Sequence, residues 1–301
     1  MVLVITLGWG LARVGFLSTP ALGELNRLTY WVGLPSLLVV RIGGAEPAFD
    51  AVGGMLAVLI TTTVIILALG IVVGWVWRMP ARSWVTFLHG SFRGNLTFVG
   101  LPVVIYAFAG SPQASAVESA ALIAFVPMVI VYNVIAVTLM QLPGQSRPLA
   151  ALKRVLLGLG TNPILLATLL GMAIALLELP LPVFLDRTLS AIGQMALPLA
   201  LIGIGGGLYA TRVRGKRHWA AASAAIKTGF GPLVGLAVGS WLGLGSEEMR
   251  LVLIFLACPS AAAAYVLVQQ MDGDTALIAS TIVLSHLFAL PAMVVVLALT
   301  A

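Results

Sequence analysis

Two long apolar segments, about half the chain length apart, are each interrupted by a proline motif. The first, residues 92–109, contains Gly-Leu-Pro, and the second, residues 253–269, contains Ala-Cys-Pro-Ser. Each is followed by a segment that contains Ala-Leu-Ile-Ala, at 121–124 and 276–279. Interrupted membrane helices in corresponding places of two halves indicate a transporter whose binding site lies at the interruptions. The sequence therefore predicts two related halves.

Composition excludes a soluble globular protein. Of the 301 residues, 60% are hydrophobic and 9% are charged, and the mean hydropathy is +1.11, whereas soluble domains carry about 25% charged residues. The net charge of +6 comes from basic clusters between apolar spans, which orient a protein in the lipid bilayer, so no nucleic-acid partner is expected. The single cysteine, Cys258, and the lack of a Cys/His cluster predict no disulfide, metal site or cofactor.

A membrane helix needs about 20 apolar residues, and the sequence contains ten such spans. They are roughly residues 1–17, 25–42, 52–77, 84–109, 115–140, 152–177, 184–209, 218–242, 248–270 and 274–300. Most basic residues lie in the loops after spans 1, 3, 5 and 7, namely Arg78, Arg82, Arg147, Lys153, Arg154, Arg212, Arg214, Lys216 and Arg217. By the positive-inside rule, both termini face outside.

Five spans per half is an odd number, so the second half enters the membrane with the opposite orientation. We therefore expect an all-α polytopic membrane protein with ten transmembrane helices, arranged as two inverted five-helix repeats. The repeats are residues 1–145 and 146–301, joined by a short loop at Gln141 to Leu152. Interrupted spans 4 and 9 then cross near the middle of the membrane.

The breaks and the nearby polar residues supply the predicted site. A broken helix exposes carbonyls that attract cations and N–H groups that attract anions. The predicted substrate-binding residues are Arg93, Asn95, Leu101, Pro102, Val103, Pro259, Ser260 and Ala261. The predicted structural crossover residues are Gly100, Pro102, Cys258 and Pro259.

Each polar candidate also has a structural interpretation. Asn95 could bond the backbone of a neighbouring helix, and Arg93 could extend to the lipid headgroups. His286 in span 10 could take part in proton coupling or in an ordinary interhelical hydrogen bond. These alternatives stay open at the level of sequence.

The chain resembles the auxin efflux carrier family, which includes plant PIN exporters and bacterial carriers. The similarity is carried by residues 95–102 (Asn-Leu-Thr-Phe-Val-Gly-Leu-Pro), by residues 259–267, and by the helix at 274–291 that ends in Ala-Leu-Pro. It extends over essentially the whole chain. The resemblance implies a bile-acid-symporter-like fold in which spans 3–5 and 8–10 form a transport domain. Spans 1, 2, 6 and 7 would form a scaffold that often makes homodimers.

The resemblance further implies an elevator-type carrier of organic anions, with Asn95 in contact with substrate. The chain lacks the long insert of plant members, and four alanines follow Ser260, so auxin is not the expected substrate. We expect a secondary transporter of a small carboxylate in a bacterial cytoplasmic (inner) membrane. The alternatives are a sodium-coupled symporter and a non-transporting receptor. A membrane enzyme, and hence any catalytic residue, is not expected, because no DxxxD pair lies at an inner helix end.

Overall fold

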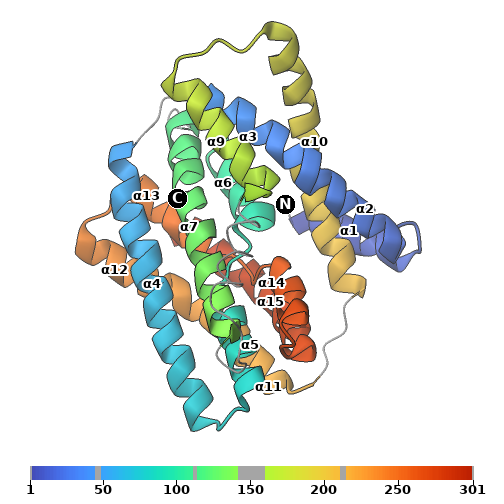
Figure 1. Ribbon diagram of the computed structural model, residues 1–301, viewed down its shortest axis with the longest axis vertical. Helices are drawn as coiled ribbons and strands as arrows, with labels where there is room; N and C mark the ends of the chain where they lie inside the picture. Colours follow the sequence, from blue (N-terminus) through green and yellow to red (C-terminus); the bar gives the residue numbers. More distant parts are fainter. Residues whose placement is uncertain (1, 45–48, 111–113, 142–159, 211–214, 300–301) are drawn as a thin grey trace. The chain divides into compact units, whose positions relative to one another are not determined.

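The computed structural model describes residues 2–44, 49–110, 114–141, 160–210 and 215–299, which form helices and no strand (Figure 1). Within these residues, five helices are long and apolar enough to cross a membrane. They are Val52–Val76, Ser119–Met140, Val183–Tyr209, Arg217–Leu242 and Thr275–Leu299. Shorter apolar helices are Leu3–Arg13, Leu96–Ala107 and Pro163–Leu176. The predicted all-helical membrane protein is confirmed, whereas the ten-span inverted repeat stays a prediction.

The chain divides into two compact units by its internal contacts. The first unit comprises Met1–Asp50, Leu101–Val126 and Leu157–Thr211. The second unit comprises Ala51–Gly100, Pro127–Leu156 and Arg212–Ala301. Each unit is therefore discontinuous in sequence.

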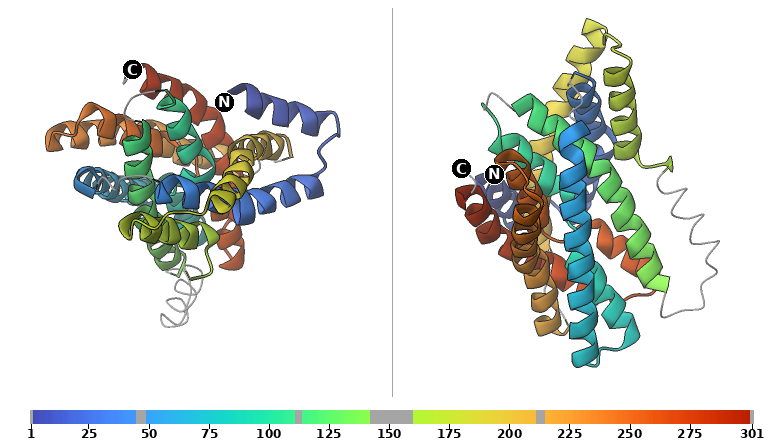
Figure 2. Two further views of the ribbon diagram at one scale, coloured as in Figure 1. Left: turned by 90° about the horizontal axis from the view of Figure 1, so that it is seen from above. Right: turned by 90° about the vertical axis from the view of Figure 1, so that its left-hand side faces the viewer.

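The first unit is held together by close helix packing. Its helices are α1 (Val2–Arg13), α2 (Thr19–Leu28), η1 (Thr29–Gly33), α3 (Leu34–Gly43), α6 (Leu101–Ala107), α9 (Pro163–Leu176) and α10 (Val183–Ala210). Helix α1 runs alongside α10, and α3 packs against both α9 and α10 (Figures 1 and 2). Gly8 and Gly205 lie directly against backbone atoms of the facing helix, where a Cβ atom would overlap. Small residues give membrane helices this close approach.

The second unit contains both helix breaks. Its helices are α4 (Phe49–Val76), α5 (Ala81–Phe92), η2 (Leu96–Gly100), α11 (Arg217–Ala225), η3 (Ile226–Phe230), α12 (Gly231–Leu242), α13 (Ser246–Ala257), α14 (Ala263–Gln270) and α15 (Thr275–Leu299). Helix α7 (Ala114–Gln141) contributes to both units. Helix α15 packs against α5, α11 and α13. The Asp274 carboxylate caps α15 by accepting from Leu277 N (3.0 Å) and also accepts from Ser83 Oγ of α5 (2.8 Å).

Three five-residue π-turns, η1, η2 and η3, each lie just before a proline. The prolines are Pro35, Pro102 and Pro232. Proline has no N–H and obstructs the carbonyl four residues earlier, and a wider π-turn accommodates that disturbance without ending the helix. Pro102 consequently lies inside a continuous helix. The sequence placed the break of span 4 at this proline, whereas the structure places it at residues 93–95.

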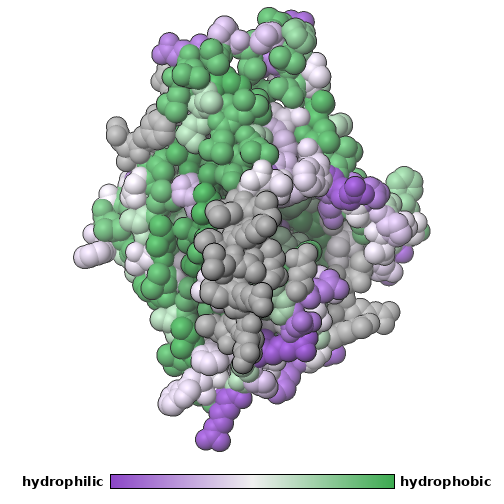
Figure 3. Space-filling model, in the orientation of Figure 1, coloured by the Kyte–Doolittle hydropathy of each residue, from purple (hydrophilic) through white to green (hydrophobic). Residues whose placement is uncertain are grey.

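Apolar side chains cover the outside of the long helices. On α4, Val64, Val72 and Trp75 are more than half exposed, and the face drawn in Figure 3 is apolar along this helix. Side chains of this kind fit a lipid environment rather than water. Residues 142–152 of the predicted loop lie outside the described residues. So do most of the basic residues that predict the orientation, namely Arg147, Lys153, Arg154, Arg212 and Arg214.

Candidate functional site

The first break separates α5 from the helix that begins at η2. Helix α5 ends at Phe92, and Arg93 has an extended backbone with φ −78° and ψ 99°. Asn95 then caps the next helix, because its backbone oxygen accepts from Gly100 N (3.0 Å) and its Oδ1 accepts from Phe98 N (3.2 Å). A side-chain oxygen at this place satisfies a helix N–H that has no internal partner.

The second break, residues 258–262, lies where the sequence placed it. Helix α13 ends at Ala257 and α14 begins at Ala263. Cys258 and Ser260 are fully buried, and Ala261 is nearly so. Pro259 cannot donate a backbone hydrogen bond, which helps to end α13.

The two breaks cross and exchange backbone hydrogen bonds within the second unit. Asn95 N donates to Pro259 O (2.7 Å), and Ala261 N donates to Arg93 O (2.9 Å). Gly94 and Ser260 thereby form an isolated antiparallel bridge. In an apolar interior every such backbone group needs a partner, so each break supplies what the other lacks.

Ser260 is engaged in holding this crossing together. Its Oγ donates to Gly90 O of α5 (2.6 Å), and its N donates to Ser285 Oγ of α15 (2.9 Å). The buried His286 follows Ser285 on α15, and its Nδ1 lies 2.8 Å from Ile282 O of the same helix. Proton coupling through His286 stays an untested prediction.

Two glycines permit the close crossing. A Cβ atom at Gly100 would lie 3.1 Å from Cys258 Sγ and from the Phe255 ring. A Cβ atom at Gly94 would lie 3.1 Å from Lys227 Cε. Both distances are tighter than an ordinary carbon contact. A Cβ atom at Gly100 would therefore require the Cys258 or Phe255 side chain to shift, and one at Gly94 would require the Lys227 side chain to shift.

Arg93 is turned into the second unit. Its guanidinium donates to Asn133 Oδ1 of α7 (2.7 Å) and lies 3.3 Å from His89 Nε2. The alternative in which Arg93 extends to the lipid headgroups is therefore not the geometry observed. The buried His89 also belongs to this cluster, and its Nδ1 has no hydrogen-bond partner among the described residues.

Sequence reasoning missed Lys227, which lies in η3. Its side chain is 1% exposed, and Nζ donates to Leu256 O near the end of α13 (2.5 Å). It is the one lysine inside the apolar span 218–242. Ionisable residues inside membrane segments usually face an interior and serve a function, so this rule could have identified Lys227 from sequence.

Several donors at the crossing have no acceptor in the described part of the chain. They are the Asn95 amide nitrogen Nδ2 and the backbone N–H groups of Ala262 and Ala263. Ala262 and Ala263 are exposed and form the start of α14. Free N–H groups and the helix dipole make such a start attractive to anions.

Not all predicted site residues are grouped here. Arg93, Asn95, Gly100, Cys258, Pro259, Ser260 and Ala261 come together in the second unit. Leu101, Pro102 and Val103 are buried at the start of α6 and are assigned to the first unit. They follow η2 within one helix and so are not a helix start with free N–H groups, because the helix begins at Leu96.

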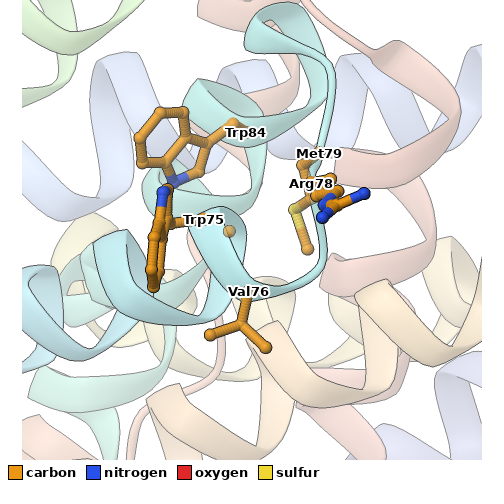
Figure 4. Close-up of a pocket in the computed structure, with 6 residues that line it drawn as sticks. Trp75, Val76, Arg78, Met79 and Trp84 are labelled. Atoms are coloured by element: carbon orange, nitrogen blue, oxygen red, sulfur yellow. The ribbon is translucent and has the colours of Figure 1, made fainter.

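A separate pocket of about 500 Å³ lies at the turn between α4 and α5 (Figure 4). It is lined by Gly74, Trp75, Val76, Arg78, Met79 and Trp84. The 12 residues of α5, about 18 Å of helix, separate this turn from the break at Arg93. The pocket is therefore distinct from the crossing.

A family model described as membrane transport protein matches residues 1–297. The match includes both breaks and all described helices up to the last turn of α15. No curated protein matches the chain.

Proposed function

Because the chain belongs to the membrane transport protein family, we propose that it is a secondary transporter of a small organic anion. The proposed substrate is a carboxylate, and the proposed site is the crossing of the two breaks. We further propose a bacterial cytoplasmic membrane as its location, with both termini outside.

The observation that carries this proposal is the charge at the crossing. Arg93 and the buried Lys227 bring two cationic side chains to it. The acidic residues described in the second unit, Glu247, Glu248, Asp272 and Asp274, lie at or next to the starts of α13 and α15. Lys227 forms no salt bridge with a described carboxylate, and a cation in such a position is costly in an apolar interior. An anionic substrate would lower that cost.

The unpaired donors suit the oxygen atoms of a carboxylate. Asn95 Nδ2 extends from the first break, and the N–H groups of Ala262 and Ala263 come from the second. A carboxylate accepts several hydrogen bonds at once, and bonds to a charged group are stronger than neutral ones. The proposed role of Asn95 is therefore twofold, with Oδ1 as a helix cap and Nδ2 as a substrate donor.

The division into two compact units supports an elevator-type movement. The first unit holds the helices of spans 1, 2, 6 and 7, which we propose as a scaffold and homodimer surface. The second holds the crossing, which we propose as the moving part. The division assigns parts of spans 4 and 5 to the first unit, whereas the resemblance assigned these spans entirely to the transport domain.

A flux experiment in liposomes tests the proposal. Counterflow of mono- and dicarboxylates should be saturable for the native chain. Asn95→Asp keeps an oxygen for the cap but replaces the Nδ2 donor with negative charge. The kcat/KM should therefore fall by at least about 10- to 100-fold, the effect of losing one hydrogen bond to a charged group. The kcat/KM of Asn95→Ala should fall by a similar factor.

The matched control is Asn162→Ala. Asn162 caps α9 in the first unit, where its Oδ1 accepts from Ile164 N and Leu165 N. Its loss removes a helix cap without touching the crossing, so flux per folded molecule should stay close to native. Equal losses in both alanine variants would contradict a substrate role for Asn95.

The two alternatives give different results in the same assay. A sodium-coupled symporter would show flux that disappears when sodium is replaced by choline. A non-transporting receptor would bind carboxylates but show no counterflow. The cationic crossing favours the anion carrier over sodium coupling, because like charges repel in an apolar interior.

A further inference from the structure

We propose that the Lys227 ammonium group is a tethered cation that occupies the place of a coupling ion, so that transport by this chain needs no sodium. The part of this inference that concerns transport rests on the proposed function. The part that concerns ion binding does not. The ion-binding part predicts that removal of the Lys227 side chain opens a site for sodium or lithium.

The end of α13 has the properties of a cation site. In a regular helix the carbonyls of Phe255, Leu256 and Ala257 would accept from the N–H groups four residues later. Position 259 is proline and has no N–H. The N–H of Ser260 donates to Ser285 Oγ instead, and that of Ala261 donates to Arg93 O. All three carbonyls therefore lack their helical donors.

Freed carbonyls at the end of a half-helix bind the coupling cation in many carriers with broken helices. They also carry the partial negative charge of the helix dipole. Here Lys227 Nζ donates to the Leu256 carbonyl at 2.5 Å. The chain's own ammonium group thus lies where such carriers bind a cation.

The surroundings of Lys227 are fitted to its side chain. The residue is 1% exposed. Gly94 of the first break leaves room for it, since a Cβ atom there would lie 3.1 Å from Lys227 Cε and 3.3 Å from Nζ. The structure shows no salt bridge between Lys227 and any described carboxylate. The hydrogen bond of Nζ is with a backbone carbonyl of α13, the kind of oxygen that a bound metal cation would also contact.

A lysine in this place differs from a bound ion because it cannot dissociate. A symporter needs its cation to bind and leave with the substrate, whereas a covalently held ammonium group supplies the same charge in every state. The Lys227 ammonium group thus offsets the partial negative charge of the free carbonyls at the end of α13 in every state. Such a carrier does not consume a sodium gradient.

Thermal unfolding of the purified full chain tests ion binding without any substrate. The midpoint of the native chain should be equal in sodium, lithium and choline chloride. Lys227→Ala should unfold at lower temperature in choline and recover part of that loss in sodium or lithium. Lys227→Met fills the same space without charge, so it should be destabilised and show no recovery.

The matched control is Lys216→Ala. Lys216 is exposed and lies over the Trp219 ring at 3.8 Å. This variant should show the native midpoint in all three salts. A sodium-dependent recovery in Lys227→Met equal to that in Lys227→Ala, or no recovery in either, would overturn the inference of a vacated cation site.

The native chain supplies a measurement that needs no variant. Carboxylate counterflow should be unchanged when sodium is replaced by choline, and radioactive sodium should show no saturable binding. Sodium-dependent flux or binding in the native chain would overturn the tethered cation while leaving the proposed transport intact. Absence of any carboxylate flux, together with the expected unfolding pattern, would instead remove the proposed function alone.

Discussion

The two breaks in the second unit are alike in backbone and unlike in side chains. Each gives one N–H and one carbonyl to the other, through Asn95 N to Pro259 O and Ala261 N to Arg93 O. The first break adds a guanidinium and an amide. The second adds a serine that is already bonded to Gly90 and Ser285. One break thus offers polar side chains for recognition, whereas the other offers mainly backbone.

The largest expected effect comes from removing a shared backbone bond. In Ala261→Pro the donor to Arg93 O is lost, and an unpaired carbonyl in an apolar interior costs several kcal/mol. We expect little folded protein, as measured by size-exclusion chromatography after expression. The neighbouring change Ala262→Pro is the control, because the Ala262 N–H has no acceptor in the described residues and its φ of −59° already suits proline.

Ala262→Pro also tests the substrate role of the second break. We expect a folded protein with an increased KM for the carboxylate, since one proposed donor is missing. If Ala262→Pro leaves KM unchanged, then the second break contributes structure alone, and the difference between the two breaks is greater than proposed.

A smaller effect is expected from Arg93→Gln. The change removes a positive charge from the first break and should weaken carboxylate binding by about 10- to 100-fold, the value of a charged hydrogen bond. Flux as a function of substrate concentration measures it. Arg82→Gln, which changes an exposed arginine at the start of α5, should leave KM at its native value. A native KM in Arg93→Gln would limit Arg93 to holding Asn133.

The smallest effect is expected from Ser260→Ala. It removes the bond from Oγ to Gly90 O, worth about 1 kcal/mol, so the thermal midpoint should fall by a few degrees with little change in KM. Thermal unfolding and flux together separate these outcomes. A loss of affinity as large as that of Asn95→Ala would show that both breaks recognise substrate through side chains.

The sequence predicted the location of the second break but not of the first. At Cys258-Pro259-Ser260 the proline coincides with the end of α13. Pro102 gave the same signal, yet the π-turn η2 accommodates it without ending a helix, and the preceding helix α5 ends ten residues earlier, at Phe92. A proline changes the local hydrogen bonding in both places. Whether the helix ends depends on partners elsewhere in the chain, which here are the Pro259 carbonyl and the Ala261 N–H.

The sequence by itself determined that this chain is a helical membrane protein with two interrupted helices, because apolar length and proline placement act locally. It also identified Arg93 and Asn95, since polar residues are rare in such segments. Only the tertiary structure decided that Asn95 is a helix cap with a free amide nitrogen and that Ser260 is occupied. It also decided that Lys227 reaches the end of α13, 29 residues away in sequence. These facts depend on which distant backbone groups meet at the crossing, and a single sequence does not encode that meeting in any local pattern.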